Sequence, residues 1–94
     1  MLGIHVIYTA KPGRREEFLS RLAACGAPAM VRGERGCVQY DYFLSAEHPD
    51  QVLLLEKWTS REEQQAHLSQ PHMALVRTIK DDCIDDTALE TFEL

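Results

Sequence analysis

The sequence has few cysteines, and their spacing suggests neither a disulfide framework nor a zinc site. Its 94 residues include Cys25, Cys37 and Cys83, an odd number with no Cys-x-x-Cys pair. Small extracellular domains commonly depend on disulfides, whereas cytosolic thiols stay reduced. The chain also begins without a basic segment followed by a long apolar one, so no secretory signal is indicated. We therefore expect a cytoplasmic protein with free thiols.

Basic residues and long apolar runs are also scarce. Ten Lys and Arg residues against fifteen Asp and Glu residues give a formal net charge of −5 at pH 7, which disfavours sequence-independent binding to a phosphate backbone. The aliphatic run at residues 52–55 stops at Glu56 and is far shorter than the roughly 20 residues that cross a bilayer. We therefore expect no nucleic-acid partner and no association with a membrane.

Motifs for metals and cofactors are missing as well. No two histidines stand three or four residues apart, and no cysteine stands near a histidine, so the usual ligand spacings are absent. No glycine-rich phosphate loop follows an expected strand, and no Gly-x-Ser-x-Gly motif is present. We expect neither a metal site nor a bound cofactor.

What the chain does contain is apolar sequence sufficient for one small domain. Hydrophobic residues make up 45% of the chain and charged residues 27%, which is typical of a soluble globular protein. Residues 1–94 should form a single domain. A domain this small buries only roughly 60 to 65% of the surface that its unfolded chain exposes.

Apolar periodicity predicts four strands. Alternating or nearly continuous apolar residues favour strands at residues 2–10, 37–44, 51–58 and 87–94. In the second strand, Val38, Tyr40, Tyr42 and Leu44 should share one face. The third strand is apolar almost throughout, which is typical of a central strand covered on both faces.

Two helical regions are expected between these strands. The first begins near Arg14 and should kink where Gly26 and Pro28 interrupt it. In the second region, Ser60 and Glu63 have the spacing of a capping box.

The second helical region should also be interrupted. Pro71 suits the first turn of a new segment, so we expect a break near Ser69 and Gln70. Asp81 and Asp82 are acidic, and acidic side chains are unfavourable at the partly negative C-terminal end of a helix. This helical segment should therefore end near Lys80.

The β-α-β-β-α-β order predicts an α+β, ferredoxin-like fold, with a four-stranded antiparallel sheet and both helical regions on one face. The other face would be left open although several of its residues are apolar. An open apolar face on so small a chain favours a second copy as its cover. We expect a homodimer.

Two histidines are the strongest candidates for catalysis. His67 and His72 could each accept a proton near neutral pH. On an ideal helix, residues five positions apart point about 140° away from each other, so the two imidazoles converge only if the helix breaks near Pro71. The alternative is that His67 packs in the core and His72 lies at the surface.

Aromatic and acidic strand residues are candidates for binding a substrate. Glu56 and Trp58 share a strand face, so the indole could wall a pocket while the carboxylate holds a histidine in one tautomer. Tyr8, Tyr40 and Tyr42 could donate hydroxyls to a substrate oxygen. The alternative is that these side chains pack the core and that Glu56 pairs with a Lys or Arg.

Several motifs together resemble the antibiotic biosynthesis monooxygenase family, and within it the small quinol monooxygenase-like proteins. They are Pro12-Gly13, Gly36-Cys37, Glu56-x-Trp58 and Ala66-His67-Leu68-x-x-Pro71-His72-Met73. The resemblance implies a dimeric α+β barrel in which two sheets pack face to face. It also implies a pocket between the sheet and the helices of each subunit.

The resemblance further implies a cofactor-free monooxygenase acting on a phenolic, quinol or anthrone-like substrate, with a His general base. Two alternatives stay open: an isomerase of a small carbonyl or phosphorylated metabolite, and a non-catalytic dimeric ligand-binding or stress protein. Haem-degrading relatives use an Asn, a Trp and a His, and this chain has Tyr8, His67 and Arg77 at the matching positions. We do not expect haem degradation.

Overall fold

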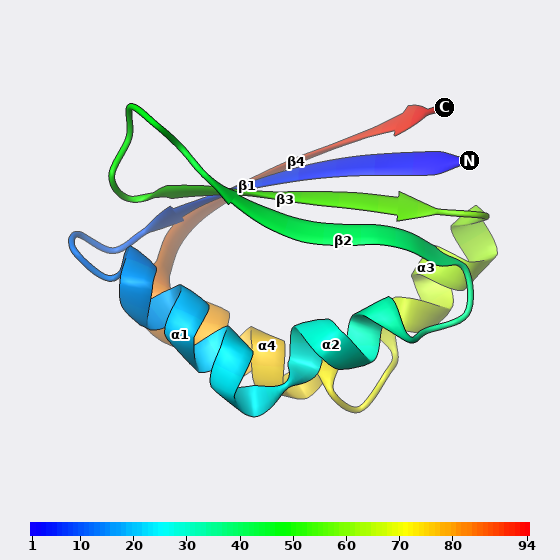
Figure 1. The fold of residues 1–94 in the computed structure, drawn as a ribbon, viewed down its shortest axis with the longest axis horizontal. Coiled ribbons are helices and arrows are strands. Elements are labelled where there is room, and N and C mark those ends of the chain that lie inside the picture. The colour runs from blue at the N-terminus through cyan, green and yellow to red at the C-terminus, as the bar shows by residue number, and fades with distance from the viewer.

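The computed structural model describes residues 1–94 and confirms the ferredoxin-like α+β fold. Its elements are β1 (Leu2–Ala10), α1 (Arg15–Cys25), α2 (Ala27–Arg32), β2 (Cys37–Leu44), β3 (Gln51–Trp58), α3 (Arg61–Leu68), α4 (Met73–Cys83) and β4 (Ile84–Glu93). The strands form one antiparallel sheet in the order β2-β3-β1-β4. The helices lie on one side of this sheet, and the two chain ends lie side by side (Figure 1). None of the helices is long and hydrophobic enough to span a membrane.

The core lies between the sheet and the helices because alternate strand residues point toward them. Along β3, Val52, Leu54, Glu56 and Trp58 are buried and the residues between them are half-buried. Phe18 from α1 packs into the same layer and is fully buried. The prediction that β3 is central is confirmed, since it pairs with both β1 and β2. Within one chain, however, the helices cover only one of its faces.

The start of β2 departs from simple alternation. The register with β3 shifts between Cys37 and Gln39, so two residues on β2 oppose one on the partner strand, as in a β-bulge. Cys37 then packs against the core, and Val38 is exposed. The prediction that Val38 shares a face with Tyr40 was therefore wrong, because the extra residue reverses the alternation.

The predicted kink in the first helical region is a full break between α1 and α2. Gly26 has a φ of 76°, and its amide donates to the carbonyl of Ala23. This left-handed conformation suits glycine and ends a helix. Pro28 lies in the first turn of α2, where its missing amide hydrogen costs nothing. The chain therefore changes direction at Gly26.

Half of the predicted capping box is present at α3. The Ser60 hydroxyl accepts a hydrogen bond from the Glu63 amide at 3.2 Å. The Glu63 carboxylate does not return to the Ser60 amide, because it accepts from the Thr59 hydroxyl and pairs with Arg35. The predicted break near Ser69 is confirmed, with Pro71 inside the turn that precedes α4.

Helix α4 continues past the predicted end at Lys80 and stops at Cys83. The acidic residues are tolerated because two basic side chains from the β1–α1 turn reach the last carbonyls. Lys11 Nζ donates to the carbonyl of Asp81, and an Arg14 Nη nitrogen donates to that of Asp82 at 2.7 Å. These cations satisfy orphan carbonyls and oppose the negative helix end.

Strand β4 also begins earlier than predicted, at Ile84 rather than Thr87. Because α4 ends at Cys83, the chain passes directly from the helix into the strand. Asp85 and Asp86 therefore lie within β4, at its exposed start.

The sheet face opposite the helices carries apolar side chains. Pairing places Leu53 directly between Ile7 on β1 and Phe43 on β2. Ile7 and Phe43 are each more than 40% exposed. This row of three apolar residues is the centre of the surface on which we expect a second copy to pack.

The dimer prediction can be tested at this row. The wild-type chain should have a solution mass of about 21 kDa, twice the 10.7 kDa of one chain. Leu53→Lys should lower the mass to that of a monomer, because a lysine at the centre of the interface would be desolvated. Light scattering after size exclusion provides the measurement.

Leu75→Lys is the matched control. Leu75 is an exposed leucine of α4, on the helical side of the sheet, so this variant should keep the wild-type mass. A wild-type chain that is a stable monomer at micromolar concentration would contradict the prediction.

Candidate functional site

His67 and His72 converge on one carboxylate, that of Glu34. Nδ1 of His67 lies 3.2 and 3.0 Å from the two carboxylate oxygens. Nε2 of His72 lies 2.7 Å from Oε2 of the same group. Both imidazoles and the carboxylate are largely shielded from solvent, with side-chain exposures of 2%, 12% and 10%. We call these three residues the Glu34 cluster.

The turn between α3 and α4 is what brings the two histidines together. His67 lies in the last turn of α3, and His72 directly precedes α4. Between them, the amide of Gln70 donates to the carbonyl of His67, and the amide of Met73 donates to that of Gln70. These tight turns replace a continuous helix, on which the two rings would diverge by about 140°. Glu34 completes the cluster from the connection between α2 and β2.

The His67 ring rests on aromatic side chains of the sheet. Its centroid is 4.8 Å from that of Trp58, and 5.8 Å from that of Tyr40. Because a carboxylate only accepts hydrogen bonds, Nδ1 of His67 must carry the hydrogen that it shares with Glu34. In the neutral ring, Nε2 then holds the free lone pair. The cluster therefore fixes the orientation and the tautomer of the His67 imidazole.

A cavity of about 400 Å³ opens over the Glu34 cluster. Its lining includes Met30, Gly33, Glu34, Ala66, His67 and His72. This volume lies within the range of small-molecule sites, roughly 300 to 1,000 Å³. No group of three or more His, Cys, Asp or Glu side chains has an arrangement suited to a metal ion.

Glu56 does not hold a histidine, so that part of the sequence interpretation was wrong. Its Oε1 accepts a hydrogen bond from Trp58 Nε1 at 3.0 Å within the core. Burial raises the pKa of Glu56, while the indole hydrogen bond and the nearby His67 oppose the increase. The carboxylate therefore fixes the indole ring on which His67 rests.

Two of the candidate tyrosines, Tyr8 and Tyr40, take different places. Tyr40 contacts His67 and lies beneath the Glu34 cluster. Tyr8 instead packs against Phe18, with a ring separation of 5.4 Å, and Lys80 Nζ lies 5.3 Å from its ring centroid. Burial raises the pKa of both hydroxyls, with Tyr42 adding to the increase. Tyr8 therefore belongs to the core and not to the cavity over the histidines.

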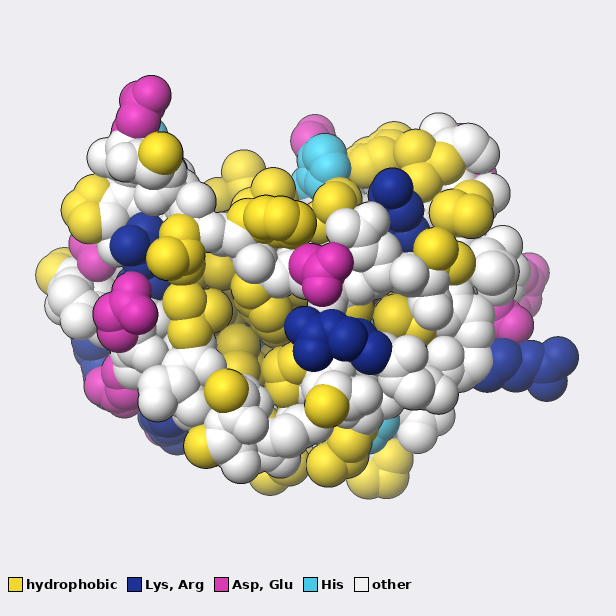
Figure 2. Space-filling model, viewed as in Figure 1, with side chains coloured by type: hydrophobic (Ala, Val, Ile, Leu, Met, Phe, Trp, Pro, Cys, Tyr) yellow, Lys and Arg dark blue, Asp and Glu magenta, His cyan; other side chains and the backbone are white.

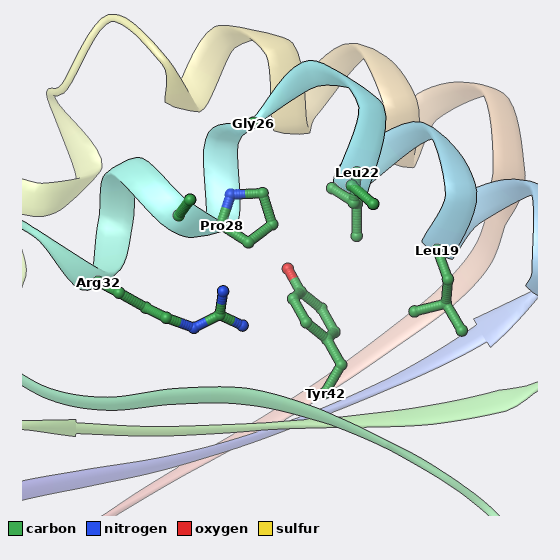
Figure 3. A pocket seen from close by; sticks show the side chains of 8 residues that line it. Leu19, Leu22, Gly26, Pro28, Arg32 and Tyr42 are labelled. Atoms are coloured by element: carbon green, nitrogen blue, oxygen red, sulfur yellow. The ribbon is translucent and has the colours of Figure 1, made fainter.

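A second cavity, of about 270 Å³, lies on the other side of α2. Leu19, Leu22, Pro28, Arg32 and Tyr42 are among the residues that line it (Figure 3). Neither Arg32 nor Glu34 stood out in the sequence, because charged residues beside glycines are typical of a solvated connection. Helix α2 thus separates two cavities, one lined by imidazoles and one mainly by apolar side chains.

Comparisons with known proteins agree with this architecture. The family model described as antibiotic biosynthesis monooxygenase matches residues 1–78. A protein from Nitrosomonas europaea, whose name provisionally assigns it to the same family, superposes with a TM-score of 0.88 at 21% identity, over 99% of this chain and 97% of its own. No match was found among curated proteins.

Two other solved structures extend the comparison. A conserved Bacteroides thetaiotaomicron protein of unknown function, described as a possible oxidoreductase, is 26% identical with a TM-score of 0.86 over 99% and 96% of the two chains. A conserved Methanosarcina mazei protein is 23% identical with a TM-score of 0.80, over 99% of this chain and 93% of its own. The fold is therefore shared at low sequence identity.

The raised pKa of Glu56 leads to a prediction about stability. The folded protein holds the carboxyl proton more tightly than the unfolded chain, so ionisation of Glu56 lowers stability as the pH rises above its ordinary value of 4.5. Glu56→Gln keeps an acceptor for Trp58 and removes the charge. Its free energy of unfolding should match that of the wild type at pH 4 and exceed it at pH 7, as measured by urea denaturation.

Glu56→Leu is the control for the hydrogen bond. It removes the charge and the acceptor together. The buried indole N–H of Trp58 is then left without a partner, which should lower the free energy of unfolding by about 1 to 3 kcal/mol. A Glu56→Gln protein that is less stable than the wild type at pH 7 would contradict the prediction.

Proposed function

Because the chain belongs to the antibiotic biosynthesis monooxygenase family, we propose that it is a small cofactor-independent monooxygenase for a phenolic, quinol or anthrone-like substrate. His67 is the general base of the proposed reaction. The observation that carries the proposal is the Glu34–His67 pair, which fixes the tautomer of an imidazole in the lining of a cavity of ligand size.

Proton abstraction is the first step of the proposed mechanism. Nε2 of His67 takes a proton from an activated O–H or C–H group of the substrate. The resulting imidazolium carries its positive charge next to the Glu34 carboxylate, at 3.0 Å, which stabilises it without moving a second proton. Imidazole, carboxylate and aromatic support are thus arranged before the substrate binds.

Oxygen chemistry then depends on the substrate itself. The substrate anion is electron-rich and supplies all the electrons that dioxygen requires. For an anthrone-like CH₂ group, one oxygen atom becomes the new carbonyl oxygen, and the other leaves as water with the two hydrogens of that carbon.

The remaining candidate residues have supporting roles in this proposal. His72 donates to the same carboxylate oxygen and so holds Glu34 in place. Trp58 and Tyr40 fix the His67 ring from beneath. Glu56 orients the indole of Trp58.

An isomerase of a small carbonyl compound is the second candidate function. The same Glu34–His67 pair could move a proton between two carbon atoms of such a substrate without consuming oxygen. Oxygen dependence of turnover therefore separates the two reactions.

The first kinetic prediction concerns His67. With anthrone or a naphthoquinol, under air and with chelator present, turnover should consume oxygen. His67→Gln should lower kcat by roughly 10² to 10⁴, the usual contribution of a positioned base. An oxygen electrode measures the rate, and circular dichroism checks the fold.

His48→Gln is the matched control, because His48 is an exposed residue of the β2–β3 connection, and this variant should keep the wild-type rate. Wild-type rates from the His67 variant would exclude the proposed base. Turnover that continues unchanged under nitrogen would assign the chain to the isomerase alternative.

The second kinetic prediction concerns Glu34. Glu34→Gln keeps an oxygen that can accept from Nδ1 of His67 but removes the negative charge beside the imidazolium. We expect kcat to fall by about 10- to 100-fold, in line with other residues that orient a functional histidine. The loss should be smaller than that of His67→Gln. An unchanged kcat would show that the carboxylate has no part in the reaction.

A further inference from the structure

The second cavity lies where the break between α1 and α2 holds the chain away from β2. Leu19 and Leu22 of α1, Pro28 of α2 and Tyr42 of β2 line it. Figure 2 shows apolar side chains inside a hollow on this side of the molecule, with a basic side chain beside it. A cavity of roughly 150 Å³ accommodates benzene, so the 270 Å³ found here can hold two fused rings.

Tyr42 places an unpaired donor inside this apolar cavity. Its hydroxyl is buried without a hydrogen-bond partner and points toward Pro28 and Leu22 (Figure 3). Buried polar groups without partners are rare in proteins. Burial raises the pKa of Tyr42 to about 12, so the hydroxyl keeps its hydrogen at neutral pH. The hydroxyl hydrogen therefore remains available for an acceptor on a ligand in the cavity.

Arg32 adds a positive charge at the same place. Its Nε donates to the carbonyl of Tyr40 at 2.8 Å, which anchors the guanidinium, and its two terminal nitrogens make no hydrogen bond within the protein. The guanidinium points into the space that the Tyr42 hydroxyl also faces (Figure 3).

Asp41 is the only carboxylate paired with Arg32. It lies 3.8 Å from Nε, and its other oxygen accepts from Gln39 at 3.1 Å. The terminal nitrogens of Arg32 are thus left for a ligand.

We propose that this cavity binds a planar, bicyclic aromatic carboxylate. One carboxylate oxygen accepts from the Tyr42 hydroxyl, and the Arg32 guanidinium pairs with the other, while the rings pack against Leu19, Leu22 and Pro28. Both protein groups are donors and one is a cation, which favours an anion over a neutral carbonyl. The site is separate from the Glu34 cluster, and the proposal does not depend on the proposed monooxygenase function.

The test compares 2-naphthoate with its neutral isostere 2-naphthamide by isothermal titration calorimetry at pH 7, with no turnover required. Naphthoate should bind at least tenfold more tightly than the amide. Arg32→Gln should weaken naphthoate binding about tenfold and abolish the preference for naphthoate over naphthamide. The expected loss of affinity is modest because the Arg32 side chain is 47% exposed. Tyr42→Phe should weaken binding of both compounds.

Two further variants make the result specific. Ala29→Phe places a ring in the cavity and should prevent binding of both compounds, while unchanged thermal unfolding confirms that the protein is folded. Arg35→Gln removes an exposed arginine just beyond α2 and should leave binding unchanged. Equal affinity for acid and amide, or naphthoate binding that survives both Arg32→Gln and Ala29→Phe, would overturn the proposal.

Discussion

The Glu34 carboxylate is the contact on which the arrangement of the helical layer depends. It is anchored on the α2–β2 connection and accepts hydrogen bonds from residues 33 and 38 positions further along the chain. Those donors stand at the end of α3 and the start of α4. A single shielded carboxylate therefore joins three segments, and its charge is compensated by two N–H donors rather than by a lysine or arginine.

Helix α2 owes its position to such tertiary contacts. It has only six residues, and an isolated helix of that length is not stable in water. Ala27, Pro28 and Val31 are buried against the core. The left-handed Gly26 allows the chain to turn before α2, and the hydrogen bonds of the Glu34 cluster hold the chain in place after it. Both cavities take one wall from this short segment, so their shapes depend on the same few contacts.

Features encoded by neighbouring residues could be predicted from the sequence, and features that depend on distant partners could not. The break at Gly26 and Pro28, the start of α3 at Ser60, and the approach of His72 to His67 all follow from local backbone preferences. The strand order and the layers follow from the apolar pattern.

Two of the errors share a physical origin, a partner that lies far away along the chain. The end of α4 was placed too early because Lys11 and Arg14, about 70 residues before it, satisfy its carbonyls. Glu34 was missed for the same reason, since nothing near it in the sequence distinguishes it from a solvated acid. Glu56 was assigned to a histidine although Trp58, two residues away on the same face, is its partner. The catalytic roles of the histidines and the dimer are still predictions.

The shared wall has a thermodynamic consequence. Any displacement of α2 that improves its contacts with a molecule in one cavity also moves the lining of the other. If both proposed sites bind their ligands and one ligand displaces α2, the two occupancies are linked by a coupling free energy. This linkage is reciprocal: a ligand beside Tyr42 that changes affinity at the Glu34 cluster by some factor must have its own affinity changed by the same factor. In that case, cooperativity between two small molecules would arise within one subunit of 94 residues.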